Sequence, residues 1–290
     1  LRQMYHIATS KVVVLDSYCI AVSVLCQRKS LTVIQMWHAL GALKRFGLSI
    51  VGEGEGSSRD LAESMSMHKN YTWVLTSGRA CLPYFSEAFG YDEKAVKVMP
   101  LPRVDKLTDD EFARSAVKRV RERYPRFEGK KIVVYAPTFR KDKDISREID
   151  DLAEKFDDSE YIFVLKKHPL MKETCDNCLA DEEFSTLEML FAADYVICDY
   201  SAVIFEAAIL KKPLFFYTFD YDTYGATRDF YIDYMKEMPG VISGDPSCIA
   251  DSIKEDKYDL ERVEKFGRRF VEKQENCARD LAEMIIGYCK

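Results

Sequence analysis

Residues Phe191 to Asp233 read FAADYVICDYSAVIFEAAILKKPLFFYTFDYDTYGATRDFYID. The apolar run from Tyr195 to Asp199 predicts a buried strand, and the run from Ala202 to Leu210 predicts a helix. A second buried strand is predicted from Pro213 to Tyr217. A strand, a helix and a second strand in this order form a βαβ unit, so the sequence predicts an α/β protein with a parallel sheet.

The turn Asp199-Tyr200-Ser201 follows the first of these strands. In an open parallel sheet, ligands bind outside the carboxyl ends of the strands, which places this turn where a ligand would be held. Ser201 is a predicted N-cap, and the helix behind it would offer unpaired N–H groups and a partial positive charge. We therefore expect this turn to bind a phosphate.

Composition limits the classes of function. The chain has 290 residues, of which 47% are hydrophobic and 12% aromatic, and this is enough for two domains of ordinary size. Its 42 basic and 48 acidic residues give a net charge of −6 and are spread along the chain. This distribution argues against nucleic acid as the main partner, so a site for an anionic substrate must be local.

Nine cysteines, an odd number at irregular spacing, predict no disulfide framework and a reducing compartment. Cys175 and Cys178 form a C-x-x-C, but a zinc site would need a further pair of ligands, and we expect no metal there. No apolar run approaches the roughly 18 residues of a membrane span, and no signal-peptide pattern opens the chain. Because the first residue is Leu1, we expect further sequence upstream.

The N-terminal part alternates strands and helices. Strands are predicted at Lys11 to Asp16, Leu31 to Met36, Tyr71 to Thr76 and Ala95 to Pro100, with a helix from Arg79 to Phe89.

Trp37 and His38 follow the second of these strands, with Lys44 and Arg45 on the turn beyond. In a site, this position would place an imidazole in a cleft. Alternatively, Trp37 and Leu40 belong to the core and His38 is a capping or packing residue. Between this stretch and the third strand, the glycine-rich sequence VGEGEGSS predicts a mobile surface loop rather than a phosphate loop, because Glu53 and Glu55 would repel phosphate.

The clearest linker runs from Pro100 to Asp110, where prolines and charges interrupt the pattern. We predict three parts: an N-terminal domain over residues 1–104, a C-terminal domain over 105–255, and closing helices over 256–290 that pack across the domains. Candidate core residues of these helices are Val263, Phe266, Phe270, Leu281, Met284 and Ile285.

Two further predicted strands end in basic groups. Lys130 to Tyr135 is followed by APTFRKDKD, and Tyr161 to Leu165 is followed by KKHPL. If these strands and Tyr195 to Asp199 are neighbours in one parallel sheet, one crevice receives Arg140, Lys166, Lys167, His168 and the helix at Ser201. Such a cluster suits a diphosphate, since Arg can contact phosphate in a bidentate manner and Lys acts as a point charge. The alternative is that these groups are solvated loop ends.

Five motifs in order carry a family resemblance. They are WHALGALK (37–44), YAPTFR (135–140), KKHP (166–169), ADYVICDYSAVIFEAAILKKP (193–213) and RDFYIDY (228–234). Together they resemble the CDP-glycerol glycerophosphotransferase family, the polyol-phosphate primases and polymerases of teichoic-acid type. The resemblance implies a GT-B-like α/β fold, in which two Rossmann-like domains face a cleft, and we expect the N-terminal, acceptor-side domain to be short and incomplete here.

The resemblance also implies an activity: an acceptor hydroxyl attacks the polyol-bearing phosphate of CDP-glycerol or CDP-ribitol and CMP is released. Carried over by motif, the catalytic residues would be His38, as general base or proton relay, and His168. Contacts to the CDP-polyol phosphates would come from Arg140, Lys166, Lys167, Asp199, Ser201 and Arg228. Trp37 and Lys44 would lie on the acceptor side.

Partners follow from the same resemblance. We expect a CDP-polyol donor, a lipid-linked polyol-phosphate or glycan acceptor, no obligatory metal or cofactor, and a cytoplasmic protein that contacts the inner face of the membrane. Ala39 and Leu40 resemble members that use ribitol phosphate, while Ala202 replaces a usual serine and removes one hydroxyl from the phosphate site. Both polyols stay open, as do the oligomeric state and the choice between primase and polymerase. Two alternatives are a GT-B nucleotide-sugar glycosyltransferase and a non-catalytic nucleotide-binding module.

Overall fold

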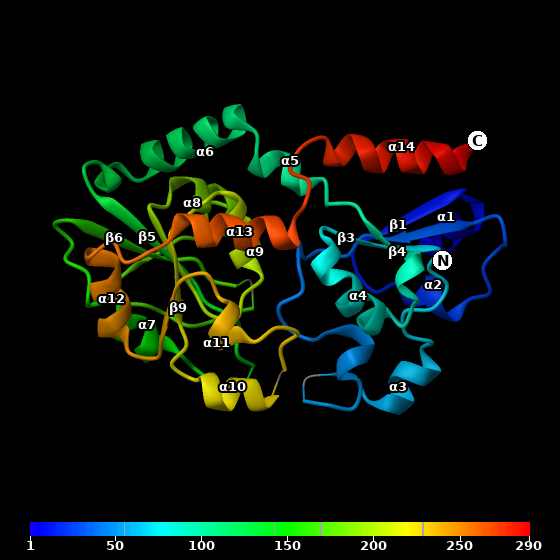
Figure 1. Cartoon of the computed structure of the whole chain (residues 1–290), viewed down its shortest axis with the longest axis horizontal. Coiled ribbons are helices and arrows are strands. Elements are labelled where there is room, and N and C mark those ends of the chain that lie inside the picture. Colours follow the sequence, from blue (N-terminus) through cyan, green and yellow to red (C-terminus); the bar gives the residue numbers. More distant parts are fainter. Residues whose placement is uncertain (55, 142, 169, 228) are drawn as a thin grey trace. The chain divides into compact units, whose positions relative to one another are not determined.

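Two parallel sheets organise the computed structural model of the chain, which describes residues 1–54, 56–141, 143–168, 170–227 and 229–290 (Figure 1). One sheet has the strand order β1-β2-β3-β4, with β1 Val12–Leu15, β2 Thr32–Gln35, β3 Trp73–Thr76 and β4 Val96–Val98. The other has the order β10-β9-β8-β5-β6-β7, with β5 Lys131–Ala136, β6 Tyr161–Leu165, β7 Leu179–Ala180, β8 Tyr195–Cys198, β9 Leu214–Tyr217 and β10 Val241–Ser243.

Helices connect these strands and form both ends of the chain. Up to β5 they are α1 Arg2–Thr9, α2 Ile20–Val24, η1 Gly47–Ile50, α3 Arg59–Ser64, η2 Arg79–Cys81, α4 Leu82–Phe89, η3 Glu93–Ala95, α5 Arg103–Leu107, α6 Asp110–Arg123 and η4 Pro125–Phe127. After β5 they are α7 Ser146–Ala153, α8 Thr186–Ala192, α9 Val203–Ile209, α10 Tyr221–Thr227, α11 Tyr234–Glu237, α12 Pro246–Lys254, α13 Leu260–Phe270 and α14 Cys277–Cys289.

The chain forms two compact units. The first consists of Leu1–Asp105, Tyr224–Ile232 and Arg268–Lys290, and the second of Lys106–Thr223 and Asp233–Gly267. Each unit contains one of the two sheets. The division into residues 1–104, 105–255 and 256–290 stays a prediction.

The second unit is a doubly wound sheet with helices on both faces (Figure 1). Alternate strand residues such as Val133 and Phe215 pack with α7 and α12, while α8 and α9 pack against β5, β8 and β9. Strands buried on both faces need apolar residues at every position, which is why they appear in the sequence as continuous apolar runs. The predicted strand from Tyr161 to Leu165 is confirmed without any change of its bounds.

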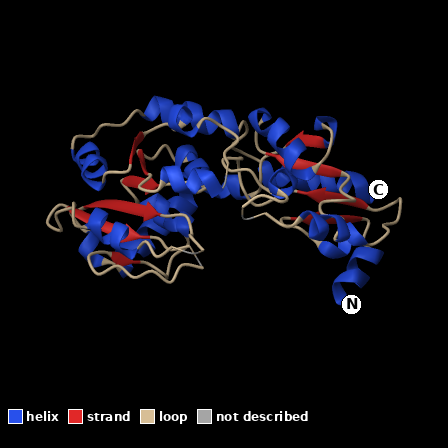
Figure 2. Cartoon of the chain, turned by 90° about the horizontal axis from the view of Figure 1, so that it is seen from below, coloured by secondary structure: helices blue, strands red, loops and turns tan. Residues whose placement is uncertain are grey.

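The first unit is closed by the C-terminal helix. In α14, Leu281 is buried and packs with Ile34 and Leu75 of the sheet, while Met284 and Ile285 lie partly buried beside them. The burial predicted for Val263, Phe266 and Phe270 is also confirmed. Figure 2 shows the strands of each sheet with helices beside them.

Three features differ from the sequence-based expectation. Strands β7 and β10 were not predicted, because two and three residues are too few to show a periodic pattern. The helix predicted from Ala202 begins at Val203, and its N-cap is Ala202, not Ser201. Cys175 and Cys178 form a disulfide, since a local loop brings their Cα atoms to 5.7 Å, while the other seven cysteines are free thiols.

Candidate functional site at the switch point of the second sheet

The site of the second unit lies where the order of the sheet reverses. From β5 the chain adds β6 and then β7 on one side, and it returns to add β8, β9 and β10 on the other side. The neighbours β5 and β8 therefore form the topological switch point, with Ala136 paired to Cys198 at their carboxyl ends. Loops that leave two adjacent strands in opposite directions open a crevice, which is the usual ligand site of such sheets.

Asp199 joins the loops that follow β5 and β8. Its fully buried carboxylate accepts from the Thr138 backbone N–H at 2.9 and 3.1 Å, from Thr138 Oγ1 at 2.6 Å and from its own neighbour Tyr200 N–H at 2.6 Å. The hydroxyl of Tyr234 donates to the Asp199 carbonyl oxygen at 2.7 Å. These bonds fix the turn after β8 against the loop after β5.

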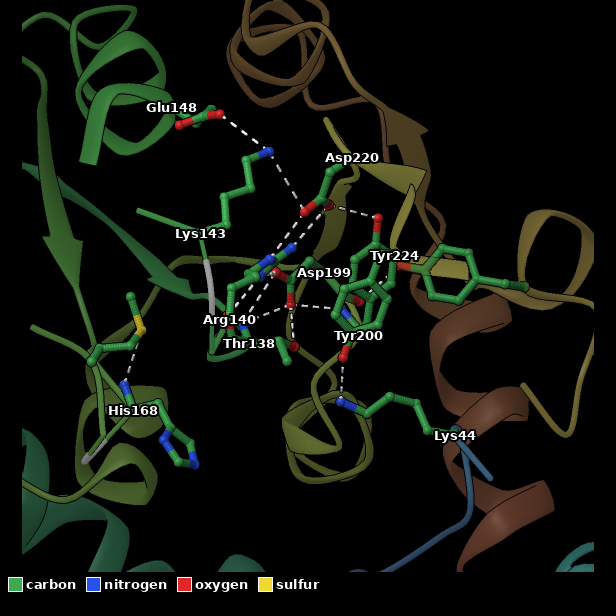
Figure 3. Close-up of polar contacts among 12 residues, drawn as sticks. Lys44, Thr138, Arg140, Lys143, Glu148, His168, Asp199, Tyr200, Asp220 and Tyr224 are labelled. Atoms are coloured by element: carbon green, nitrogen blue, oxygen red, sulfur yellow. Dashed lines mark hydrogen bonds and ion pairs between the residues drawn. The ribbon is translucent and has the colours of Figure 1, made fainter. Parts of the chain in front are cut away.

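Arg140 lies between two carboxylates, as Figure 3 shows. Its Nε and Nη2 donate to the two oxygens of Asp220 at 3.1 and 3.0 Å, and its Nη1 donates to Asp199 and, at 2.5 Å, to the Thr138 carbonyl. The Arg140 side chain is only 5% exposed. Burial by itself lowers the pKa of the guanidinium, but Asp199 and Asp220 outweigh burial and hold that pKa above its usual value.

Tyr200 completes this cluster. Its hydroxyl donates to Asp220 at 3.1 Å, and burial, together with the charges of Asp220 and Asp199, raises its pKa well above the usual value. The half-exposed Lys143 places its Nζ at 3.9 Å from Asp220 and at 3.4 Å from Glu148. The positive charge predicted at this edge is thus largely balanced by carboxylates of the protein itself.

Lys166 and Lys167, which follow β6, are also paired. The buried Lys166 donates to the Asp181 carboxylate at 2.8 Å, to the Asp181 carbonyl at 3.2 Å and to the Phe184 carbonyl. Lys167 is 2.6 Å from Glu182. Lys166 therefore anchors the chain that follows β7, and contact of either lysine with a diphosphate stays a prediction.

His168 is exposed and its ring is oriented by two neighbours. It stacks on Phe139 with ring centroids 5.8 Å apart, and its Nδ1 accepts from the Leu170 N–H at 3.2 Å. An Nδ1 that accepts leaves the proton of a neutral imidazole on Nε2. His168 can therefore donate a hydrogen bond to an anionic oxygen.

Ser201 stands just before α9, and its Oγ accepts from the Val203 N–H at 3.4 Å. It is half-buried and comes from the same turn as Asp199. Arg140, His168 and Ser201 thus follow three adjacent strands, β5, β6 and β8, at one edge of the sheet. Arg228, the remaining predicted donor contact, lies outside the described residues.

His38 and Trp37 belong to the first unit. The His38 side chain is exposed, and its Nδ1 is 2.9 Å from the Asp16 carbonyl oxygen, which follows β1. Arg103 donates to the His38 carbonyl. The half-buried Trp37 stacks on Phe46, with ring centroids 5.1 Å apart.

Lys44 also belongs to the first unit. Its Nζ donates to the hydroxyl of the buried Tyr224 at 2.9 Å (Figure 3). Tyr224 lies in the segment Tyr224–Ile232, which is part of the first unit. The residues before and after this segment in the sequence belong to the second unit.

Sequence reasoning missed several residues of this arrangement, including Thr138, Asp181 and Asp220. A signal for Asp220 was present, because it comes three residues after Tyr217, the last residue of β9. The strand-end rule that selected Arg140 and Ser201 would have selected it too. Nothing in the sequence marks Asp181 as the partner of Lys166.

With the geometry established, comparison with known proteins places the chain. The sequence profile described as CDP-Glycerol:Poly(glycerophosphate) glycerophosphotransferase matches residues 1–286. The chain belongs to this family.

Relatives of known name support the membership. The chain is 34% identical to the teichoic acid ribitol-phosphate primase of Bacillus spizizenii over 98% of its own length and 77% of the relative. It is 33% identical to the teichoic acid poly(ribitol-phosphate) polymerase of the same organism, over 93% of its own length but 45% of the polymerase. It is 30% identical to the teichoic acid glycerol-phosphate primase of that organism, over 93% of its own length and 72% of the relative.

Solved structures agree on the fold. A structure of the wall teichoic acid polymerase TagF matches with a TM-score of 0.79 and 24% identity, over 96% of this chain and 72% of that one. The UDP-GlcNAc 2-epimerase of Neisseria meningitidis matches with a TM-score of 0.58 and 13% identity, over 95% and 76%. The fold predicted for the glycerophosphotransferase family, of GT-B type with parallel sheets, is confirmed.

In residues 1–54, 56–141, 143–168, 170–227 and 229–290, no three His, Cys, Asp or Glu side chains are grouped so as to hold a metal ion. In the same part of this glycerophosphotransferase-family chain, no helix has the length and apolar character required to cross a membrane.

Proposed function

We propose that this chain transfers a polyol phosphate from a CDP-polyol to a hydroxyl of a teichoic-acid-type acceptor and releases CMP. The observation that carries the proposal is the match to a polyol-phosphate primase over 98% of the chain. The family profile extends over residues 1–286, so the likeness includes both units. These relatives favour the phosphotransferase over the alternative of a nucleotide-sugar glycosyltransferase.

Ribitol phosphate is the polyol that we infer. Relatives named for ribitol phosphate match at 31 to 34% identity, and relatives named for glycerol phosphate match at 28 to 30%. Ala39 and Leu40, which follow His38, resemble the ribitol-using members of the family. CDP-ribitol is therefore the expected donor.

In the proposed reaction, an acceptor oxygen bonds to the polyol-bearing phosphorus, and the bond from that phosphorus to the CMP oxygen breaks. The acceptor proton passes to His38, and such general-base assistance contributes about 10²–10⁴ in rate. His168, with its proton on Nε2, is placed to donate to a phosphate oxygen. Phosphoryl transfer depends mainly on positioning and charge stabilisation, which the loops at the switch point would supply.

The buried charges receive a different role in this proposal. Arg140 and Lys166 bind carboxylates inside the protein, so they act as positioning residues for the loops that carry Ser201 and His168. Positive charge facing a diphosphate would come from Lys141 and Lys143, whose side chains are exposed after β5, and His168 would add a hydrogen bond from Nε2. We propose that no metal is obligatory for the reaction. The test is to measure CMP release in excess EDTA, and the rate should be unchanged.

The acceptor and the location are part of the proposal. Lipid-linked polyol phosphate is the acceptor that primases and polymerases of this type would extend, and contact with the inner face of the cell membrane would give access to it. Sedimentation with vesicles that contain such a lipid, compared with vesicles that lack it, measures this contact.

The function is tested by incubating the chain with CDP-ribitol or CDP-glycerol and a lipid-linked polyol-phosphate acceptor. CMP and a product heavier by one ribitol phosphate are the expected results, with CDP-ribitol the better donor. Donor binding without CMP would identify a non-catalytic module, and turnover of a UDP-sugar would identify a glycosyltransferase. Either result would overturn the proposal.

The role of His38 has a matched control. His38→Ala should lower CMP release at least about a hundredfold while donor binding stays nearly unchanged. His6→Ala changes another exposed histidine, in α1, and should leave the rate within twofold. Full turnover by His38→Ala would remove that residue from the mechanism.

A further inference from the structure

Gln35 is a buried polar residue at the carboxyl end of β2, and no role follows for it from the family motifs. It is 0% exposed and pairs with Leu15 of β1 on one side and Val74 of β3 on the other. Its side-chain Nε2 donates to the Ser17 carbonyl at 3.0 Å, and its Oε1 accepts from the Trp37 N–H at 2.9 Å. One amide thus joins the loop after β1 to the loop after β2.

The same two loops are joined once more, by His38. The Asp16 carbonyl oxygen lies within hydrogen-bond distance of His38 Nδ1. The carbonyl of the next residue, Ser17, accepts the hydrogen bond from Gln35. A carbonyl oxygen only accepts, so the 2.9 Å contact requires the proton of His38 to sit on Nδ1. In the neutral ring, Nε2 then carries the lone pair that can take a proton.

Trp37 lies between Gln35 and His38, the two residues that join these loops, and its backbone is constrained. Its φ is +57°, in the left-handed region that residues with a Cβ rarely adopt. The Gln35 Oε1 holds its N–H, and its indole stacks on Phe46 and lies 4.2 Å from the His38 ring, centroid to centroid. A strained residue persists only where its surroundings hold it, and it often does so at a functional position.

We propose that Gln35 is a positioning residue for His38: it holds the Asp16–Ser17 segment and the Trp37 backbone so that His38 keeps its proton on Nδ1 and offers Nε2 as proton acceptor. This inference rests on the proposed function, in which the acceptor O–H gives its proton to His38. On that transfer the proton bonds to Nε2 and the ring becomes an imidazolium, whose Nδ1–H stays on the Asp16 carbonyl.

The tautomer can be measured without any turnover. The chain has four histidines, so two-bond ¹H–¹⁵N spectra of protein labelled at histidine contain few ring signals, and loss of one set in His38→Gln assigns that residue. At a pH where the ring is neutral, wild-type His38 should show the Nδ1–H form. His168, whose Nδ1 accepts from Leu170, should show the opposite form in the same spectrum.

Substitution of Gln35 then tests whether its two hydrogen bonds position His38. Gln35→Met keeps the length of the side chain and removes both hydrogen bonds. It should increase the population of the Nε2–H form of His38 and lower kcat about tenfold or more. The KM for the CDP-polyol should stay within twofold. Gln35→Asn keeps an uncharged amide but shortens the side chain by one methylene. It should lower kcat less than Gln35→Met does, and it replaces Gln35→Met if that variant does not fold.

Gln27→Met is the matched control. Gln27 lies in the same unit and its Nε2 donates to the carbonyls of Ala21, Val22 and Leu25, so the substitution removes an amide clamp that does not touch the His38 loop. It should leave both the tautomer of His38 and kcat unchanged.

The outcomes separate the two proposals. Wild-type protein that releases no CMP would overturn the proposed function, while the spectra would still decide the tautomer. Wild-type His38 in the Nε2–H form would overturn the inference. So would an active enzyme in which Gln35→Met and Gln35→Asn leave the tautomer of His38 and kcat at wild-type values.

Discussion

The substitution Arg140→Met isolates the energetic role of the buried charges at the switch point. The guanidinium is 5% exposed and forms a two-bond contact with Asp220, as well as bonds to Asp199 and Thr138. Methionine fills much of the same volume but leaves two buried carboxylates without their cation. Removing one partner of a buried ion pair costs about 3–5 kcal/mol, because the remaining charge is neither solvated nor paired.

Of the two carboxylates, Asp220 should lose more of its hydrogen bonds and ion pairs in this variant. Asp199 keeps its donors from Thr138 and Tyr200, but Asp220 keeps only the Tyr200 hydroxyl at 3.1 Å and Lys143 at 3.9 Å among the contacts described above. We therefore expect the free energy of unfolding of the second unit to fall by about 3–5 kcal/mol. The double variant Arg140→Met/Asp220→Asn removes the unpaired charge of Asp220 and should recover part of the lost free energy of unfolding.

The assay is urea unfolding followed by far-ultraviolet circular dichroism, with stability obtained by linear extrapolation. Tryptophan fluorescence would not serve, because Trp37 and Trp73 both belong to the first unit. Lys143→Met is the matched control: it removes a second cation beside Asp220, but one that is 44% exposed and worth about 1 kcal/mol or less. If Arg140→Met cost no more than Lys143→Met, burial of the ion pair would not determine its contribution to stability.

Two further predictions concern stability. Burial lowers the pKa of His68 to about 4, so between about pH 6.5 and 4 the unfolded chain binds a proton that the folded chain does not. Stability should therefore be fully present above pH 6.5 and fall by about 3 kcal/mol as the pH approaches 4. His68→Asn, which tolerates the local φ of +61°, should remove this part of the pH dependence of the urea midpoint, and an unchanged slope would contradict the assignment. Gly240→Ala would place a Cβ 1.9 Å from the Leu214 carbonyl oxygen and should destabilise the chain by about 1–3 kcal/mol in thermal unfolding. Gly287→Ala, in α14 with nothing within 4 Å of the new Cβ, should instead stabilise it by about 0.5–1 kcal/mol, and equal effects of the two alanines would show that close approach is not the cause.

The local sequence determined the elements and the family of this protein. A strand such as Tyr161–Leu165 could be read from the sequence because both its faces are buried and every residue is apolar. The apolar positions of the last helix, including Leu281, likewise follow a periodicity that is visible in one segment. Motif order over most of the chain was enough to identify the glycerophosphotransferase family.

Only the tertiary structure decided what the charged groups of the site do. A basic residue at a strand end looks the same in sequence whether it faces a ligand or a carboxylate of the protein. Arg140 binds Asp220, which is 80 positions away, and Lys166 binds Asp181 across a loop, because the strand order brings their elements together. Gln35 was overlooked for the same reason, since its importance depends on two loops that meet only when β1 and β2 pair. Periodic burial is recorded locally in the chain, whereas charge pairing depends on which distant segments become neighbours.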